Sequence, residues 1–160
     1  MFVIPVDGID TDMIFHNRHL AITEPAKMAP HAFGNLAGYE HFPTWVEPGD
    51  LVWVGANFGC GSSRQQAVDA LMALGVQAVI GRSFGAIYWR NAVNAGLPVL
   101  TCDEDLDHVP VRTGDRIRID LASGRIELLQ QGQVVMARPL GAVPLGIVQR
   151  GGLLVSGAQA

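Results

Sequence analysis

Residues 51–67 read "LVWVGANFGCGSSRQQA", in which an apolar, β-branched run passes through a glycine-rich turn into two serines and an arginine. The apolar run predicts a buried strand, and the glycines predict a sharp turn at its end. Apolar residues then recur at helical spacing as far as about Leu74, and Gly75 supplies a C-terminal stop signal. This stretch therefore predicts a strand, a turn and a helix in immediate succession.

The polar residues at the start of the helix fit a capping arrangement. Ser62 or Ser63 stands where a helix N-cap is expected, and Gln65 or Gln66 then falls at the third helical position of a capping box. One serine that caps the helix and a second that faces water would account for both hydroxyls without any chemistry.

The alternation of strand and helix continues downstream. A short buried strand is predicted at "QAVIG" (77–81), and Ser83 is a candidate cap for a second helix over 84–95 that ends at Gly96. A third strand follows at "LPVLT" (97–101). Strands and helices in this order predict a parallel βαβαβ core with right-handed crossovers.

The flanking regions differ from this core. "MFVIPV" (1–6) predicts a strand that ends in a polar turn at 10–12, and the region 15–48 shows mixed periodicity. Strict alternation after Asp103 predicts antiparallel strands with arginines on a solvated face, at "RIRID" (116–120), "RIELL" (125–129) and "GQVVMARPL" (132–140). The expected fold class is α/β, with a parallel βαβαβ core and added antiparallel strands.

Composition limits the classes of protein to consider. The 160 residues fit one domain over 1–160, and a chain that is 49% apolar and only 16% charged suits a protein that covers part of its surface with a partner. The net charge of −4 gives no basic footprint for nucleic acid. No apolar run approaches the roughly 18 residues of a membrane span, and the acidic N-terminus does not fit a secretory signal. Cys60 and Cys102 lack metal or redox spacing, so a reducing cytoplasm is expected.

The glycine turn is also a candidate binding site. It lies at the carboxyl end of a predicted parallel strand, where ligands collect in open α/β sheets beside free helix amides. Arg64 in the first helical turn would be unfavourable for the helix dipole, but its planar fork matches a carboxylate. Positive charge and N–H donors could stabilise the alkoxide of Ser62 or Ser63, so that a serine could act as a base.

Other kinds of site fit the turn less well. Gly59, Gly61 and Arg64 occupy the three positions of a dinucleotide-binding fingerprint, but an arginine stands where the third glycine is needed. The turn lacks the Gly-Lys-Ser/Thr of a nucleotide P-loop, and no histidine is tied by sequence to Cys60 as a nucleophile. The five histidines show no metal-ligand spacing, and only His16 and His19 lie close in sequence to other candidate residues.

Several separated motifs carry a family resemblance. The chain closely resembles the 3-isopropylmalate dehydratase small-subunit family of the aconitase superfamily, and it is also similar to homoaconitase small subunits and to the swivel domain of aconitase. The resemblance covers nearly the whole chain and rests on "GIDTDMI" (8–14), "HAF" (31–33), "NFGCGSSRQQA" (57–67), "GVQAVIGRSFGAIYWRNAVNAGLPVL" (75–100) and "IVQRGGLL" (147–154).

The resemblance implies a fold, a reaction and roles for residues. The fold is a swivelling β/β/α domain, and the reaction isomerises 2-isopropylmalate and 3-isopropylmalate by dehydration and rehydration in leucine biosynthesis. Ser62 is implied as the catalytic base, Ser63 and Arg64 as ligands of a substrate carboxylate, and Asp12 as part of the same site. A [4Fe–4S] cluster is implied on a separate large iron–sulfur subunit, since two unspaced cysteines cannot hold it here. A swivel-type binding module without enzymatic activity is the alternative.

Two departures from the family pattern bear on substrate. Gln65 follows Arg64 where relatives carry Glu, which leaves Arg64 without an adjacent carboxylate. The loop "NRHLAIT" (17–23) has Ala21 at a position where many relatives carry Arg, with Ile22 beside it. An apolar loop favours an alkyl substituent, on isopropylmalate, dimethylmalate or methylmalate, over the third carboxylate of homoaconitate. Arg18 could restore the missing charge.

Overall fold

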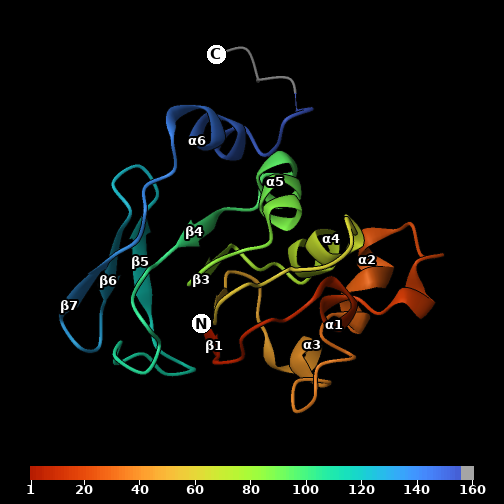
Figure 1. The fold of residues 1–160 in the computed structure, drawn as a ribbon, viewed down its shortest axis with the longest axis horizontal. Helices are drawn as coiled ribbons and strands as arrows, with labels where there is room; N and C mark the ends of the chain where they lie inside the picture. The colour runs from red at the N-terminus through yellow and green to blue at the C-terminus, as the bar shows by residue number, and fades with distance from the viewer. Residues whose placement is uncertain (156–160) are drawn as a thin grey trace.

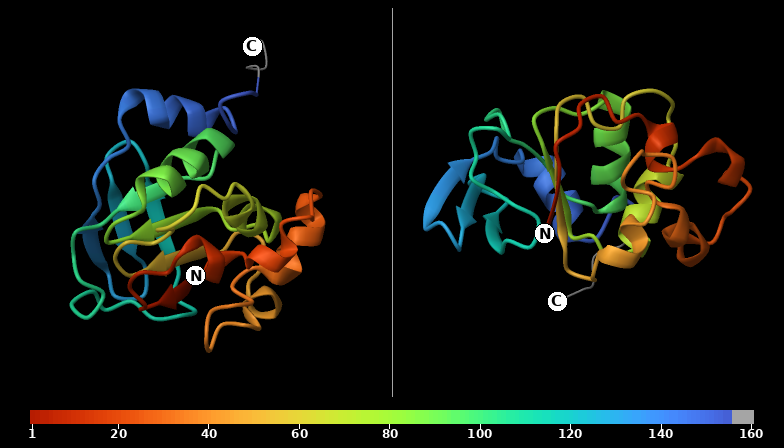
Figure 2. Two further views of the ribbon diagram at one scale, coloured as in Figure 1. Left: turned by 45° about the vertical axis from the view of Figure 1, so that its right-hand side comes forward. Right: turned by 90° about the horizontal axis from the view of Figure 1, so that it is seen from below.

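The computed structural model describes residues 1–155. Two sheets and a set of helices form three layers, with the parallel sheet in the middle (Figures 1 and 2). The strands are β1 (Phe2–Ile4), β2 (Leu51–Val54), β3 (Ala78–Gly81), β4 (Val99–Thr101), β5 (Ile117–Asp120), β6 (Arg125–Leu128) and β7 (Gln133–Met136). The helical segments are α1 (Thr11–Ile14), η1 (Asn17–His19), α2 (Pro25–Met28), η2 (Ala29–His31), α3 (Phe42–Trp45), α4 (Gln66–Ala73), α5 (Ala86–Ala95) and α6 (Ala142–Gln149).

The middle layer is the predicted parallel sheet, in the order β1-β2-β3-β4. Each strand pairs in parallel with the next one in sequence, for example Trp53 with Ile80 and Ile80 with Leu100. Helices α4 and α5 make the two crossovers of the βαβαβ unit (Figure 1). The fold class expected from the sequence is therefore confirmed.

The parallel strands are apolar on both faces because both faces are covered. One face packs on the helices, where Ile4, Val52, Val54, Val79 and Val99 share a core with Ala67, Val68, Leu71, Ala92 and Val93. The opposite face packs on the antiparallel sheet, where Trp53, Ala78, Ile80 and Leu100 meet Ile126, Leu128 and Val135. The arrangement is the β/β/α layering that the family resemblance implied.

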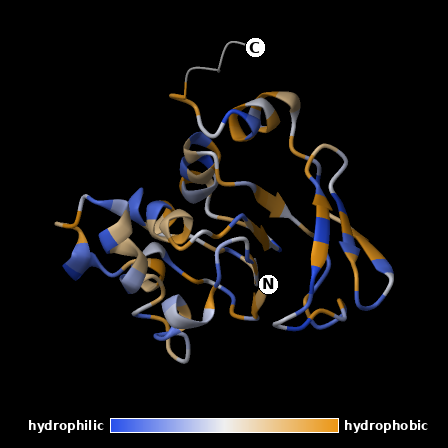
Figure 3. Cartoon of the chain, turned by 180° about the vertical axis from the view of Figure 1, so that it is seen from behind, coloured by the Kyte–Doolittle hydropathy of each residue, from blue (hydrophilic) through white to orange (hydrophobic). Residues whose placement is uncertain are grey.

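The antiparallel sheet has the order β5-β6-β7 and is buried on one face only. Its strands carry alternating hydrophobic and hydrophilic segments (Figure 3), as a half-solvated sheet requires. On the solvated face Arg118 and Arg125 both contact Glu127, at 3.1 Å in each case. The prediction that the arginines of these strands face solvent is confirmed.

The helix starts differ from the sequence prediction. Helix α4 begins at Gln66, and its N-cap is Gln65, which makes no side-chain cap. The prediction that Ser62 or Ser63 caps this helix was therefore wrong, because a bend and a turn over residues 61–65 come before the helix begins. Helix α5 is preceded by Gly85, and Ser83 accepts a hydrogen bond from the Asn57 amide instead (2.8 Å).

The helix ends agree with the prediction. Gly75 and Gly96 both adopt positive φ, at 84° and 91°, directly after α4 and α5. A left-handed residue at this position closes a helix, and glycine adopts it without strain.

The sequence did not predict the short helical segments between Thr11 and Trp45 or helix α6, which packs against α5 (Figure 1). Three- and four-residue segments are too short to show a helical period, so periodicity could not find them. Within residues 1–155, no helix combines the length and the hydropathy needed to cross a membrane.

Candidate active site

The candidate site lies where β1 and β2 leave the parallel sheet. The segments that follow these two strands remain side by side, through backbone hydrogen bonds from Gly8 to Ala56 (2.8 Å), Gly59 to Ile9 (2.7 Å) and Thr11 to Cys60 (2.9 Å). The carboxyl ends of neighbouring parallel strands meet at one edge of a sheet. This pairing brings the Asp-Thr-Asp segment next to the Gly-Ser-Ser-Arg turn, about fifty residues further along the chain.

Gly59 and Gly61 of the turn are glycines for different structural reasons. Gly59 has φ 72°, and a Cβ atom there would lie 2.2 Å from Cγ of Tyr88, so the position requires glycine for conformation and for space. Gly61 has φ 96° but ample room, with Thr11 Oγ1 the nearest atom at 3.5 Å from a built Cβ. Gly59 therefore lets the turn pack closely against Tyr88 of α5, whereas Gly61 is needed only for its backbone conformation.

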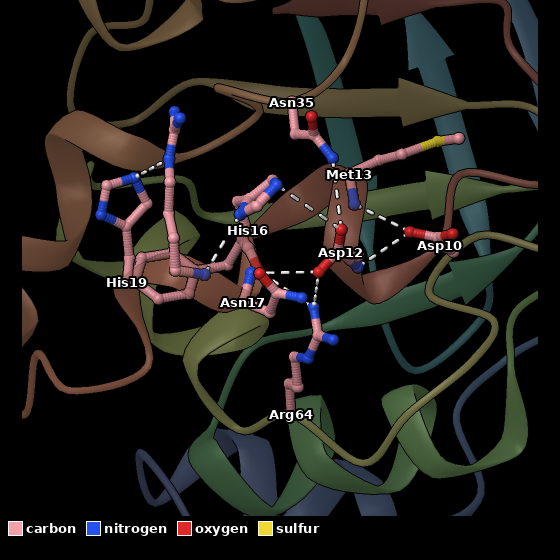
Figure 4. Close-up of polar contacts among 10 residues, drawn as sticks. Asp10, Asp12, Met13, His16, Asn17, His19, Asn35 and Arg64 are labelled. Carbon is pink, nitrogen blue, oxygen red and sulfur yellow. Dashed lines mark hydrogen bonds and ion pairs between the residues drawn. The ribbon is translucent and has the colours of Figure 1, made fainter.

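Asp12 is presented by the short helix α1. Asp10 caps this helix, because its Oδ1 accepts hydrogen bonds from the amides of Asp12 and Met13, both at 2.8 Å. The cap fixes the first turn of α1 and aims the Asp12 carboxylate toward the glycine turn (Figure 4).

Asp12 and Arg64 form an ion pair at the centre of the site (Figure 4). Arg64 Nη1 donates to Asp12 Oδ1 and also to the Phe15 carbonyl at 3.2 Å. The Asp12 carboxylate further accepts from the Asn17 amide at 3.0 Å and from Asn35 Nδ2 at 3.3 Å. Arg64 thus has a carboxylate partner from a distant segment, although the neighbouring position 65 supplies none.

The same contacts set the ionisation of Asp12. The hydrogen bond from Arg64 lowers the pKa of the Asp12 carboxyl below its ordinary value, against a smaller opposing effect of burial. The hydrogen bond from the Asn17 amide and the charge of Arg64 also lower this pKa. Asp12 is therefore held as an anion, and the pair persists at neutral pH.

Ser62 and Ser63 directly precede Arg64 in the chain and are exposed to solvent. Arg64 precedes the N-cap of α4 rather than forming part of its first turn, and the Asp12 carboxylate offsets its charge at this end of the helix. No backbone hydrogen bond among residues 1–155 uses the amides of Gln65 or Gln66 as donors. The turn therefore presents two hydroxyls, a held guanidinium and unpaired amides, which is a suitable set for an anion.

The loop after α1 holds the remaining candidate residues. Arg18 is exposed, and its Nε donates to His19 Nε2 at 2.9 Å. Ala21 is exposed, whereas Ile22 is half-buried and packs against the main core. His19 stacks on His31 with ring centroids 3.8 Å apart. These histidines, together with Asn35, are the site neighbours that sequence reasoning did not assign to the site, and only the proximity of His16 and His19 to "DTD" hinted at them.

The described residues do not offer a ligand set for an iron–sulfur cluster. No three His, Cys, Asp or Glu side chains within residues 1–155 are grouped so that they could hold a metal ion. Cys60 lies in the glycine turn with Sγ 3.6 Å from the Gly8 carbonyl, and Cys102 is buried in the core between the two sheets. A cluster that takes three or four cysteine ligands does not fit these residues.

Comparison with known proteins identifies the family. The family model described as the aconitase C-terminal domain matches residues 18–105, which include the serines and Arg64 and begin just after Asp12. The chain belongs to the aconitase C-terminal domain family. Within this family it is of the small-subunit, hydro-lyase type, and the resemblance predicted from the sequence is confirmed.

Relatives in the aconitase C-terminal domain family match nearly the whole chain. The chain is 40% identical over 148 residues to the 3-isopropylmalate dehydratase small subunit of Caldicellulosiruptor bescii, which covers 92% of this chain and 87% of that protein. A methanogen homoaconitase small subunit from Methanothermobacter thermautotrophicus is also 40% identical, over 92% of this chain and 83% of its own length. The crystal structure of a 3-isopropylmalate dehydratase from Methanocaldococcus jannaschii superimposes with a TM-score of 0.85 at 34% identity, covering 96% of this chain and 89% of that one.

Proposed function

We propose that this chain, acting as a single swivel domain over 1–160, is the small subunit of a hydro-lyase that interconverts 2-isopropylmalate and 3-isopropylmalate. The observation that carries the proposal is the Asp12–Arg64 pair, formed across two strand ends beside exposed Ser62 and Ser63. Relatives named 3-isopropylmalate dehydratase small subunit support the choice of reaction.

Arg64 is proposed to bind a substrate carboxylate while it stays paired with Asp12. A guanidinium has five N–H donors, and within residues 1–155 the hydrogen bonds of Arg64 use only Nη1. Nε and Nη2 remain for a carboxylate, together with the hydroxyl of Ser63. Asp12 then acts as the partner that keeps the fork in one orientation before substrate arrives.

Ser62 is proposed as the base. Its oxygen removes the proton from the carbon next to the hydroxyl-bearing carbon, a C=C bond forms as the hydroxyl leaves, and the reverse steps add water with the hydroxyl on the other carbon. Asp12 neutralises much of the Arg64 charge, so backbone amides of the turn that donate to no backbone acceptor, such as those of Gln65 and Gln66, are the proposed donors to the Ser62 alkoxide.

A large subunit that carries a [4Fe–4S] cluster is the proposed partner. The cluster supplies a Lewis acid that assists loss of the hydroxyl group. Ser62 and Ser63 are solvent-exposed in this chain, so a second protein surface is needed to close the site around the substrate and exclude water. A cytoplasmic hetero-oligomer is consistent with an oxygen-sensitive cluster and two free cysteines.

The loop at 17–22 favours an alkyl substituent on the substrate. Ala21 is exposed and apolar, so it offers no ion pair to a third carboxylate. Homoaconitate is a second candidate substrate, because a homoaconitase small subunit is among the relatives and the exposed Arg18 could bind the third carboxylate of homoaconitate.

The test is reconstitution of the chain with the large subunit from the same source under anaerobic conditions, with isopropylmaleate hydration as the assay. Ser62→Ala is expected to lower kcat by about 10²–10⁴-fold, since it removes only the proton-transfer group. Ser63→Ala is the matched control and is expected to act mainly on KM. Equal activity of wild type and Ser62→Ala would exclude Ser62 as the base, and a preference for homoaconitate would favour the second candidate.

A further inference from the structure

Two different side chains hold the first two backbone amides of the substrate-facing loop. The Asn17 amide donates to Asp12 Oδ1 at 3.0 Å, and the Arg18 amide donates to His16 Nδ1 at 3.1 Å. His16 is thus the N-cap of η1, a position that short side chains such as Ser, Thr, Asp and Asn usually occupy. The start of the loop is therefore tied to one residue of the ion pair and to one histidine.

The cap bond determines the tautomer of His16. A ring nitrogen that accepts an N–H must carry its lone pair, so the proton of the neutral imidazole is on Nε2. Nε2 lies 4.0 Å from Asp12 Oδ2 (Figure 4). That distance is too long for a direct hydrogen bond, but it is short enough for electrostatic attraction between the ring N–H and the carboxylate. One ring therefore faces the loop backbone with one nitrogen and Asp12 with the other.

The far part of the loop is also fixed by polar and ring contacts. Arg18 Nε donates to His19 Nε2 at 2.9 Å, and the His19 ring stacks on His31. The Ile22 amide donates to the His19 carbonyl at 2.9 Å. A loop held at both ends transmits a displacement of its N-terminal anchor to Ala21, the exposed residue proposed to face the substituent.

We propose that His16 is a positioning residue that fixes the loop 17–22 against the Asp12–Arg64 pair and thereby sets discrimination among alkyl substituents of different size. The inference rests on the proposed function for its kinetic part. His16 does not touch the reacting atoms in this scheme; it acts through the Arg18 amide and the orientation of Asp12.

Two substitutions distinguish the role of the hydrogen-bond acceptor in the cap from the role of the imidazole ring itself. His16→Ala removes the acceptor, whereas His16→Asn places an amide oxygen close to the position of Nδ1, and Asn is a favourable N-cap. His41→Asn is the control at an exposed histidine of another segment, the one before α3.

The first measurement is backbone amide exchange in the full chain without its partner. Faster exchange at residues 17–22 is expected in His16→Ala, with wild-type exchange in His16→Asn and in His41→Asn. Unchanged exchange in α4 will show that the fold is intact. Unchanged loop exchange in His16→Ala would overturn the proposal, and it would do so whether or not the assembled enzyme acts on alkylmalates.

The second measurement is the ratio of kcat/KM for isopropylmalate to that for methylmalate in the reconstituted enzyme. The ratio is expected to fall roughly three- to tenfold in His16→Ala, mainly through KM, because a displaced loop loses apolar fit rather than chemistry. Recovery in His16→Asn supports positioning by the cap. A disordered loop with an unchanged ratio would overturn the proposal, whereas a wild-type enzyme inactive on every alkylmalate would contradict only the proposed function.

Discussion

The two sides of the site come from regions of opposite character. The turn that carries Ser62 and Arg64 belongs to the region 51–101, where strands pair along their length and α4 and α5 fill one core. Asp12 and the loop 17–22 belong to the region 11–45, whose helical segments have only three or four residues each. The first region is held by sheet hydrogen bonds and apolar packing. The second also adds Phe15, Phe33 and Phe42 to that core, but its short segments are held in addition by single polar side chains, among them Asp10, Asp12 and His16.

The two regions should respond differently to substitution. In the regular region a change of shape disturbs a shared core, so it should alter the free energy of unfolding of the whole chain. In the irregular region the loss of one acceptor should loosen a short segment and alter kinetics while the core persists.

The largest effect is expected where the regular region touches the turn. Gly59→Ala should destabilise the chain by more than about 3 kcal/mol, because a left-handed backbone with a Cβ costs about 1–2 kcal/mol and the Cβ also overlaps the Tyr88 ring. Urea unfolding measures the change. Gly61→Ala is the control at a second positive φ (96°) without overlap, and equal losses in the two variants would show that the Tyr88 contact does not matter.

The second effect concerns the pair that joins the two regions. Arg64→Lys should lower kcat/KM by about 10–100-fold, because one ammonium cannot bond Asp12, the Phe15 carbonyl and a substrate carboxylate with the geometry of a planar fork. Steady-state kinetics of the reconstituted enzyme give the result. Arg118→Lys, on the solvated face of the antiparallel sheet, should leave the kinetics unchanged. A similar loss of kcat/KM in this variant would point to a general effect of replacing arginine by lysine.

A smaller effect is expected from the buried hydroxyl of Tyr88. The ring packs at right angles on Phe58, with centroids 5.1 Å apart, but the hydroxyl is buried without a hydrogen-bond partner among the described residues. Burial also raises the pKa of this phenol, so it stays neutral. Tyr88→Phe should therefore stabilise the chain by about 1 kcal/mol. Tyr88→Leu should destabilise it, and a loss of stability in the Phe variant would reveal a partner for the hydroxyl.

The smallest effect is a pH dependence in the irregular region. Burial lowers the pKa of His19 below its ordinary value of 6.5, and the neighbouring His31 and Arg18 act in the same direction. The unfolded chain therefore binds a proton at higher pH than the folded chain does. The contribution of neutral His19 to the free energy of unfolding is complete above about pH 6.5, and it is lost as the pH falls through the pKa of His19 in the folded chain.

His19→Gln isolates this contribution, because its amide oxygen can still accept from Arg18 but does not titrate. The decrease in thermal stability of the wild type between pH 7.5 and 5 should be shallower in this variant. Identical pH profiles of wild type and variant would show that His19 does not contribute.

The regular region could be predicted well because its signals are local. Apolar runs, the glycines after each helix and the alternation in β5–β7 each reflect the burial or backbone conformation of their own positions. The helix starts were predicted less well. A serine favours an N-cap wherever one is available, but residues 56–60 pair with residues 8–11, and α4 begins only at Gln66, after the serines.

The sequence by itself determined the layered α/β architecture, the family and the two segments proposed for the site, Asp-Thr-Asp and Gly-Ser-Ser-Arg, because hydrophobic period and motif order are properties of the chain alone. Only the tertiary structure decided how those residues meet. Asp12 and Arg64 lie 52 positions apart, and their pairing follows from the parallel register of β1 with β2. The role of His16 as a cap likewise depends on a bond between side chain and backbone that exists only after η1 has formed. Contacts of this kind are selected by the geometry of the folded chain, and no local pattern encodes them.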